Sequence, residues 1–144
     1  MIILDTNIIS EAVRASPNSQ VAAWYRNQSI ADLATTSVTL AELLNGVRRM
    51  PQGKRRTQLA ASIDYALMPI MEHIFAFDID AAVDYADIRA HRESLGRPIG
   101  VQDAMIAAIA RSHGATLATR NIKDFEDTGV ELVNPWEHGS AGRA

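Results

Sequence analysis

The order of apolar and polar residues along the chain predicts short strands that alternate with helices. Short runs rich in apolar and β-branched residues predict strands, at residues 2–4, 33–38, 74–77, 115–119 and 130–133. Segments whose apolar residues recur at helical spacing predict helices, at residues 7–14, 17–27, 39–50, 57–67, 81–95 and 101–113. Gly96 and Gly114 follow the last two helices, where glycine often ends a helix.

This order of elements predicts an α/β fold in three layers, with a mainly parallel central sheet and helices on both of its faces. The length of 144 residues suits one domain. No repeat or linker-like stretch divides the chain. We therefore expect a single domain over residues 1–136 and a loose C-terminal tail over residues 137–144.

Two aspartates lie in apolar surroundings. Asp5 directly follows the apolar run Ile2–Leu4, and Asp103 is the only charged residue from Val101 to Ala110. A buried carboxylate is costly unless a positive charge compensates it, and neither acid has a lysine or arginine beside it in the sequence. A bound divalent cation is one way to supply that charge.

Other polar residues fall near the same predicted edge of the sheet. Glu42 lies near the start of the helix that follows the second strand, and Asn121 and Asp124 follow the strand at residues 115–119. Ligands bind at the carboxyl ends of parallel strands, so these residues can meet Asp5 and Asp103 there. Clustered carboxylates repel one another, and oxygen ligands of this kind suit Mg²⁺ or Mn²⁺.

Each of these acids also has a purely structural explanation. Thr39 and Glu42 fit a capping box, with Thr39 as the N-cap, and Asn121 can cap a helix that contains Asp124. The helix macrodipole alone favours Asp103 near a helix start, and Asp5 can begin a turn. A capping role and a metal-binding role are compatible for one side chain.

Composition excludes several classes of protein. A hydrophobic fraction of 47% excludes a disordered chain, and the absence of cysteine excludes disulfides, thiolate nucleophiles and cysteine-based zinc sites. A net charge of -3 is not that of a protein that binds nucleic acid over its whole surface. No signal peptide or membrane-spanning run is recognisable, so we expect a soluble cytoplasmic protein.

Basic residues are concentrated in one segment, at Arg48, Arg49, Lys54, Arg55 and Arg56. Cations at a helix start oppose the macrodipole, so Lys54–Arg56 are either contacts for an RNA backbone or a solvated turn between two helices. Arg120 and Lys123 adjoin the candidate acids and are further candidates for contact with phosphate.

The chain resembles the PIN-domain nucleases, and within them the VapC-type toxins of VapBC toxin–antitoxin pairs, in the branch that includes FitB. Five segments carry this resemblance in order, at residues 3–11, 39–43, 102–108, 118–125 and 133–136. Together they span most of the chain.

The resemblance implies a three-layer PIN-like fold and Mg²⁺-dependent cleavage of RNA. Asp5, Glu42 and Asp103 match the metal ligands, and Thr6 and Asn7 match residues that orient Asp5. Where many relatives have aspartate, this chain has Asn121. The resemblance also implies a VapB-type antitoxin as partner, operator DNA bound only through the toxin–antitoxin complex, and a homodimer or larger assembly.

The resulting hypothesis is a ribonuclease toxin in which Mg²⁺, held by the acidic cluster, activates a water for attack on an RNA phosphodiester. Asn121 or Asp124 completes the catalytic set. Two rivals exist. A receiver domain is disfavoured because the strand at residues 115–119 contains no lysine. The alternative is a non-catalytic module whose acids contact a basic antitoxin within an operator-binding complex.

Overall fold

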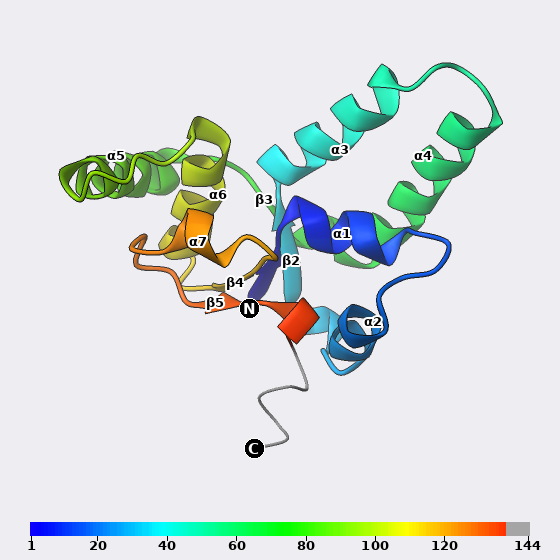
Figure 1. Cartoon of the computed structure of the whole chain (residues 1–144), viewed down its shortest axis with the longest axis horizontal. Helices are drawn as coiled ribbons and strands as arrows, with labels where there is room; N and C mark the ends of the chain where they lie inside the picture. The colour runs from blue at the N-terminus through cyan, green and yellow to red at the C-terminus, as the bar shows by residue number, and fades with distance from the viewer. Residues whose placement is uncertain (138–144) are drawn as a thin grey trace.

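The computed structural model describes residues 1–137 and has at its centre a parallel sheet of five short strands in the order β3-β2-β1-β4-β5. The strands are β1 (Ile2–Leu4), β2 (Leu33–Thr36), β3 (Ile74–Phe75), β4 (Thr116–Ala118) and β5 (Leu132–Val133). All four neighbouring pairs run parallel. Helices lie on both sides of the sheet (Figure 1), which confirms the predicted three-layer α/β fold.

Seven α-helices connect and cover these strands within the described residues, and three short 3-10 turns accompany them. The helices are α1 (Thr6–Ala12), α2 (Ser19–Arg26), α3 (Ser37–Arg49), α4 (Lys54–Leu67), α5 (Ile79–Ser94), α6 (Val101–Ser112) and α7 (Ile122–Phe125). The 3-10 turns lie at Ile30–Asp32, Met68–His73 and Pro135–Glu137. No helix within residues 1–137 is both long and apolar enough to cross a membrane.

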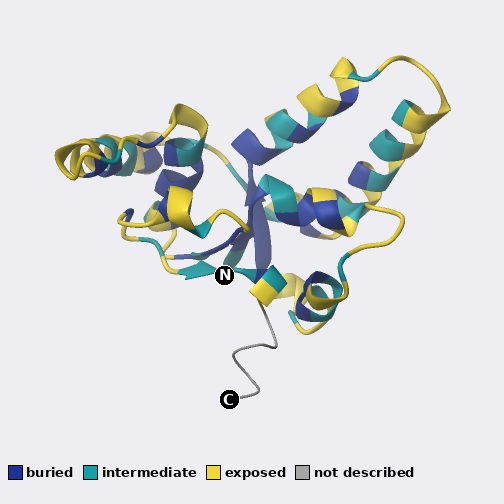
Figure 2. Cartoon of the chain, viewed as in Figure 1, coloured by how far each residue is buried: buried dark blue, intermediate teal, exposed yellow. Residues whose placement is uncertain are grey.

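The sheet separates two hydrophobic clusters because successive side chains of a strand point to opposite faces. Ile3 and Leu117 pack with residues of α5 and α6. Leu4 and Ala118 pack with α1, α3 and α4 on the other face. The central strands are buried on both faces, as Figure 2 shows in dark blue, and this explains why they read as continuous apolar runs.

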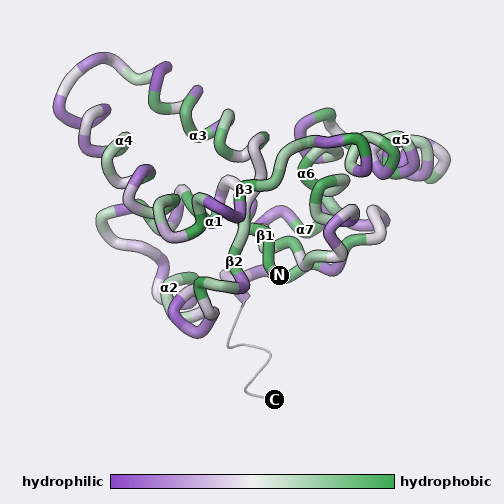
Figure 3. The backbone as a smooth tube through the Cα atoms, turned by 180° about the vertical axis from the view of Figure 1, so that it is seen from behind, coloured by the Kyte–Doolittle hydropathy of each residue, from purple (hydrophilic) through white to green (hydrophobic). Residues whose placement is uncertain are grey.

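Helices α3 and α4 form an arm that extends away from the sheet (Figure 1). The two helices contribute Leu43, Val47, Ile63 and Leu67 to the core. The segment between them is hydrophilic, as Figure 3 shows from behind. The arm is therefore anchored at its base and exposed at its tip.

The start of α3 differs from the sequence prediction. Val38 was expected to end a strand and Thr39 to cap the helix, but α3 begins at Ser37 and its N-cap is Thr36. The Thr36 hydroxyl accepts a hydrogen bond from the Thr39 backbone N–H at 3.0 Å. The predicted capping box at Thr39 and Glu42 is therefore wrong, and Glu42 lies in the second turn with another partner.

The expected tail at residues 137–144 lies outside the described residues, except for Glu137, which ends the last 3-10 turn.

Candidate active site

The candidate site lies where the carboxyl ends of β1 and β4 meet. Asp5 follows β1 and is the N-cap of α1, and its backbone N–H donates to the carbonyl of Ala118, the last residue of β4. In the sheet, β1 has β2 on one side and β4 on the other, so the order of the strands changes direction at β1. Such a switch in strand order opens a crevice at the carboxyl edge of a sheet, and Asp5 lies at that point.

Three hydrogen bonds fix the buried carboxylate of Asp5, which is 5% exposed. The Thr119 hydroxyl donates to Oδ2 at 2.7 Å, and the Asn7 amide donates to the same oxygen at 3.3 Å. The Thr6 backbone N–H donates to Oδ1 at 2.8 Å. All three donors are neutral, so they orient the carboxylate without compensating its charge.

Asn7 and Thr119 also join β1 to the segment after β4. The Asn7 Oδ1 accepts a hydrogen bond from the Arg120 backbone N–H at 3.2 Å. The Thr119 hydroxyl oxygen accepts one from the Asn121 backbone N–H at 3.1 Å. The residues that hold Asp5 therefore also place the start of α7.

Glu42 reaches the site from α3. Its Oε2 accepts a hydrogen bond from the Thr6 hydroxyl at 3.0 Å. Thr6 therefore touches both acids, Asp5 through its backbone and Glu42 through its side chain. This bond links the helix after β1 to the helix after β2, which are distant in sequence.

Asp103 lies in the first turn of α6 and is half-buried. Within the described residues its carboxylate makes no hydrogen bond and no ion pair. Burial, followed by the charges of Asp5, Asp124 and Glu42, raises the pKa of Asp103 to about 6. The charges of Asp5, Asp124 and Glu42 therefore all act on Asp103.

The pKa values of Asp5 and Glu42 are raised as well. Burial raises the pKa of Asp5 despite the three hydrogen bonds that lower it, and the charge of Asp124 raises it further. Burial and the charge of Asp5 also raise the pKa of Glu42, against the hydrogen bond from Thr6. Within residues 1–137 no lysine or arginine side chain pairs with Asp5, Glu42 or Asp103.

Glu11, in contrast, is an acid whose charge is compensated by an arginine. It is also buried, but it accepts the Asn18 backbone N–H at 2.9 Å and pairs with Arg14 at 3.1 Å. The hydrogen bond from Asn18, followed by that from Arg14, lowers the pKa of Glu11. Glu11 is a structural acid that holds the segment between α1 and α2.

Asp124 and Asn121 lie on the exposed side of the site. Asn121 precedes α7 as its N-cap, although its side chain makes no capping hydrogen bond. Within the described residues the Asp124 side chain has neither a hydrogen bond nor an ion pair. Both residues line a cavity of about 480 Å³ with Arg120, Lys123 and Asn134. Asp124 acts on Asp5 and Asp103 through its charge.

The donor set suits a hard divalent cation. Within residues 1–137 no three acidic or histidine side chains converge closely enough to hold an ion by themselves. Mg²⁺ does not require such a group, because it usually binds one or two carboxylates directly and keeps several waters. Carboxylates with raised pKa values and no cation in contact fit an ion held in this way.

The predicted basic residues occupy two separate places. Arg120 and Lys123 adjoin the acids, and the Arg120 guanidinium lies 5.0 Å from the centre of the Trp136 ring. Lys54–Arg56 instead begin α4, at the tip of the arm.

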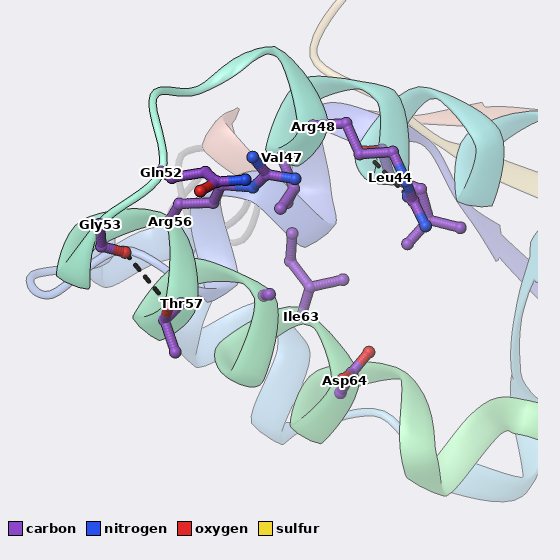
Figure 4. A pocket seen from close by; sticks show the side chains of 10 residues that line it. Leu44, Val47, Arg48, Gln52, Gly53, Arg56, Thr57, Ile63 and Asp64 are labelled. Carbon is purple, nitrogen blue, oxygen red and sulfur yellow. Dashed lines mark hydrogen bonds between the residues drawn. The ribbon is translucent and has the colours of Figure 1, made fainter.

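A pocket of about 730 Å³ lies between α3 and α4 at that tip (Figure 4). Val47 and Ile63 give it an apolar floor, and Arg48 and Arg56 lie at its rim. Arg48 donates to the Leu44 carbonyl at 3.3 Å and Arg56 to the Met50 carbonyl at 3.5 Å. The acids of the candidate site do not line this pocket.

Two participants were not identified from the sequence. Thr119 makes the shortest hydrogen bond to Asp5, and a hydroxyl residue directly after a predicted central strand was the available signal. Arg92 is buried on α5 and its charge lowers the pKa of Asp103. Its helix carries charges of both signs, so the sequence did not distinguish Arg92 from solvent-exposed residues.

Acids gathered at the carboxyl edge of a parallel α/β sheet can hold a metal ion that acts on a phosphoryl oxygen. The PIN domain pattern matches residues 2–131 of this chain. The chain therefore belongs to the PIN domain family.

Similar proteins cover nearly the whole chain. The VapC ribonuclease Y4jK of Sinorhizobium fredii is 42% identical over 138 residues, which are 95% of this chain and 99% of that protein. Toxin FitB of Neisseria gonorrhoeae is 37% identical over 137 residues, 94% of this chain and 99% of the toxin.

Solved structures share the fold. The crystal structure of FitAcB from Neisseria gonorrhoeae matches with a TM-score of 0.89 and 37% identity, over 94% of this chain and 99% of that one. VapBC2 from Rickettsia felis, bound to a DNA fragment from its promoter, matches with a TM-score of 0.76 and 32% identity. That match covers 93% of this chain and 98% of the other.

Proposed function

We propose that this chain is a Mg²⁺-dependent endoribonuclease that acts as the toxin of a type II toxin–antitoxin pair. The observation that carries the proposal is that Asp5, Glu42 and Asp103 gather at one edge of the sheet with raised pKa values. Within residues 1–137 none of the three makes an ion pair, and Asp124 lies beside them. A PIN domain with VapC ribonucleases and the FitB toxin among its relatives supports RNA as the substrate.

Asp5, Glu42 and Asp103 would hold the metal, with Mn²⁺ able to replace Mg²⁺ because both prefer oxygen ligands. When bound, such an ion supplies a water of lowered pKa and offsets charge on the phosphate oxygens. Asp124 is the fourth acid, and Asn121 contributes an amide oxygen without a charge.

The surrounding residues keep the acids ready for that ion. Thr119, Asn7 and the Thr6 backbone N–H hold Asp5 in one orientation and favour its ionised form. The Thr6 hydroxyl does the same for Glu42. Preorganisation of this kind avoids reorientation of the ligands when the substrate binds.

The substrate would contact the protein beside the acids. Arg120 and Lys123 line the cavity next to Asp124, where they can meet phosphates that flank the cleaved bond. Lys54–Arg56 at the tip of the arm are candidates for a more distant part of the RNA.

We also propose a VapB-type antitoxin as partner, with operator DNA bound only through the toxin–antitoxin complex. The support comes from the similar structures FitAcB and promoter-bound VapBC2. Homodimer formation remains a prediction of the family resemblance, and light scattering of the purified chain measures it.

The test is cleavage of a panel of RNAs by the purified chain with Mg²⁺ and with EDTA. Wild-type protein should cleave at least one RNA with Mg²⁺ only, and Asp5→Asn or Asp103→Asn should abolish cleavage. Asp87→Asn is a matched control, because Asp87 is an exposed acid on α5, and it should keep full activity.

Equal cleavage by wild type, Asp5→Asn and Asp103→Asn would indicate a contaminating nuclease and remove the support for catalysis. Binding of antitoxin without cleavage of any RNA in the panel would favour the non-catalytic module.

A further inference from the structure

Arg92 is a buried arginine without an acidic side chain in contact. It lies on α5, is 5% exposed and makes no ion pair within the described residues. Its guanidinium donates only to backbone carbonyls. Nε donates to the Arg97 carbonyl at 2.7 Å. Nη1 donates to the backbone carbonyls of Asp124 at 3.0 Å and of Glu126 at 2.9 Å. Arginine stays charged in proteins, so a full positive charge lies inside the domain.

Two of these carbonyls belong to the end of α7. This helix has only four residues, Ile122–Phe125, and so short a helix is not stable without tertiary contacts. The carbonyls at a helix end lack partners within the helix. Arg92 supplies a charged donor for them and ties α7 to α5.

Arg97 strengthens the same connection from the surface. Its guanidinium pairs with Glu126 at 3.0 Å and with Asp127 at 2.7 Å. Its backbone N–H donates to the Arg92 carbonyl at 2.9 Å, opposite the bond from Arg92 Nε to the Arg97 carbonyl. The loop after α5 is therefore closed around Arg92.

Asp124 depends on this connection because its own side chain is held by nothing else. Asp124 makes no side-chain hydrogen bond or ion pair within residues 1–137. Its backbone N–H donates to the Asn121 carbonyl at 3.0 Å, and its backbone carbonyl accepts from Arg92. The charge of Asp124 nevertheless acts on Asp5 and Asp103. The position of this acid is therefore set by the backbone of α7, whose start is placed by Thr119 and whose end is held by Arg92.

We propose that Arg92 is a positioning residue, which holds the backbone of α7 so that Asp124 stays at the acidic cluster as its fourth acid. The proposal rests on the proposed nuclease function and deepens it. It assigns the completion of the site to Asp124 and to a buried arginine on a helix that contributes no acid to the cluster.

The test compares Arg92→Met, Asp124→Asn and the double variant with wild type. Arg92→Met keeps an unbranched apolar stem in place of the arginine stem and removes the charged donors. Hydrogen exchange in EDTA should be about tenfold faster at residues 122–128 in Arg92→Met, because a lost tertiary contact permits local opening. Exchange there should be unchanged in Asp124→Asn, which leaves the Arg92 bonds in place.

Binding of Mn²⁺, measured by calorimetry, gives a second readout with a definite sign. Loss of a nearby positive charge alone would tighten the binding of a cation. Displacement of Asp124 would weaken it, by about tenfold if Asp124 supports the ion as an outer ligand does. We expect weaker binding in Arg92→Met, and unchanged or tighter binding would overturn the proposal.

The turnover number supplies the third readout. Arg92→Met and Asp124→Asn should each lower kcat by about tenfold, and the double variant should be no worse than Asp124→Asn, because the two residues act through one route. A double variant whose loss of kcat equals the product of the two single losses would overturn the proposal. So would an unchanged kcat in Asp124→Asn.

Two further variants exclude a general loss of folding. Arg92→Lys keeps the charge but cannot make the three bonds, so it should fold and show part of each effect. Arg89→Met removes an arginine one turn earlier on α5, whose contacts are with Tyr85 and Glu93, and should match wild type. If wild type cleaves no RNA, the proposed nuclease fails, while exchange and Mn²⁺ binding still decide the role of Arg92.

Discussion

Thr119 illustrates how much of the site depends on single neutral donors. Its side chain is fully buried, and its hydroxyl is 2.7 Å from the Asp5 carboxylate. A hydrogen bond to an ionised group is stronger than one between neutral groups. Because burial raises the pKa of Asp5, this donor helps to keep Asp5 ionised at neutral pH.

Thr119→Val should therefore weaken Mn²⁺ binding and lower kcat by about tenfold, since loss of a residue that orients a metal ligand has effects of this size. The control is Thr35→Val. Thr35 is equally buried, but its hydroxyl donates to the Leu4 carbonyl at 2.8 Å and not to an acid. Calorimetry and RNA cleavage measure the effects. Equal losses in both variants would mean that the effect is only structural.

Asp103 makes the stability of the metal-free protein depend on pH. Its pKa of about 6 in the folded chain exceeds the ordinary value of 3.8. As pH rises, the unfolded chain releases this proton first, so the folded state binds more protons between the two values. The free energy of unfolding therefore falls as pH rises through that window.

In EDTA the wild-type protein should melt at a lower temperature at about pH 7 than at about pH 5, and Asp103→Asn should reduce this difference. Thermal denaturation at both pH values measures it. The same pH difference in Asp103→Asn as in wild type would contradict the assigned pKa.

Asp5 and Asp103 could be identified from sequence because each is an isolated charge in an apolar stretch. Their supporting residues could not. Thr119 contacts Asp5 across 114 positions of sequence, and such a pairing depends on which strands are neighbours. Arg92 acts through backbone carbonyls, which every residue type has, so the sequence does not indicate its partners.

At the scale of elements, the start of α3 shows where local patterns are ambiguous. Thr36 and Thr39 are three residues apart, and either can serve as an N-cap before the same apolar stripe. The structure selects Thr36, so Val38 and Thr39 are helical and buried. Glu42 then lies one turn further into the helix, where it meets Thr6 rather than its own N-cap.

Removal of this cap should cost stability. Thr36→Ala leaves the Thr39 N–H without its hydroxyl acceptor, and the expected loss is about 1 kcal/mol. Thr36→Ser keeps the hydroxyl and should lose less. Urea denaturation of the two variants and wild type gives the free energies of unfolding. Equal losses in both variants would show that the methyl group, and not the cap, is what matters.

The helices and strands themselves were largely predictable, because apolar β-branched runs and helical patterns hold over most of the chain. The boundaries of strands shifted by a few residues, as for β3, which ends at Phe75 instead of Phe77. From the sequence alone, the short helix α7 could not be distinguished from a capped turn. It is held by packing against α6 and β5 and by the Arg92 hydrogen bonds from α5, and a local sequence pattern contains none of these contacts.

At the scale of the whole molecule, the strand order creates the site. β1 lies between β2 and β4, so the acids of three separate segments reach one edge: Asp5 after β1, Glu42 on α3 after β2, and Asp103 on α6. Parallel strands were expected from the sequence, and with them the gathering of these residues at a common edge. The order of the strands was not, because several orders satisfy the same connections.

Because the acids come from separate elements, an ion that links them should stabilise the fold as a unit. If Mn²⁺ binds the folded state and not the unfolded one, as proposed, a concentration of 100 times the dissociation constant should add about 2.7 kcal/mol to the free energy of unfolding. Thermal denaturation with increasing Mn²⁺ should show a rising midpoint. Asp5→Asn and Asp103→Asn should show almost none of that rise, whereas Asp87→Asn should keep it. An equal rise in all four proteins would place the ion elsewhere on the surface, and no rise in wild type would mean that the acids do not form a metal site.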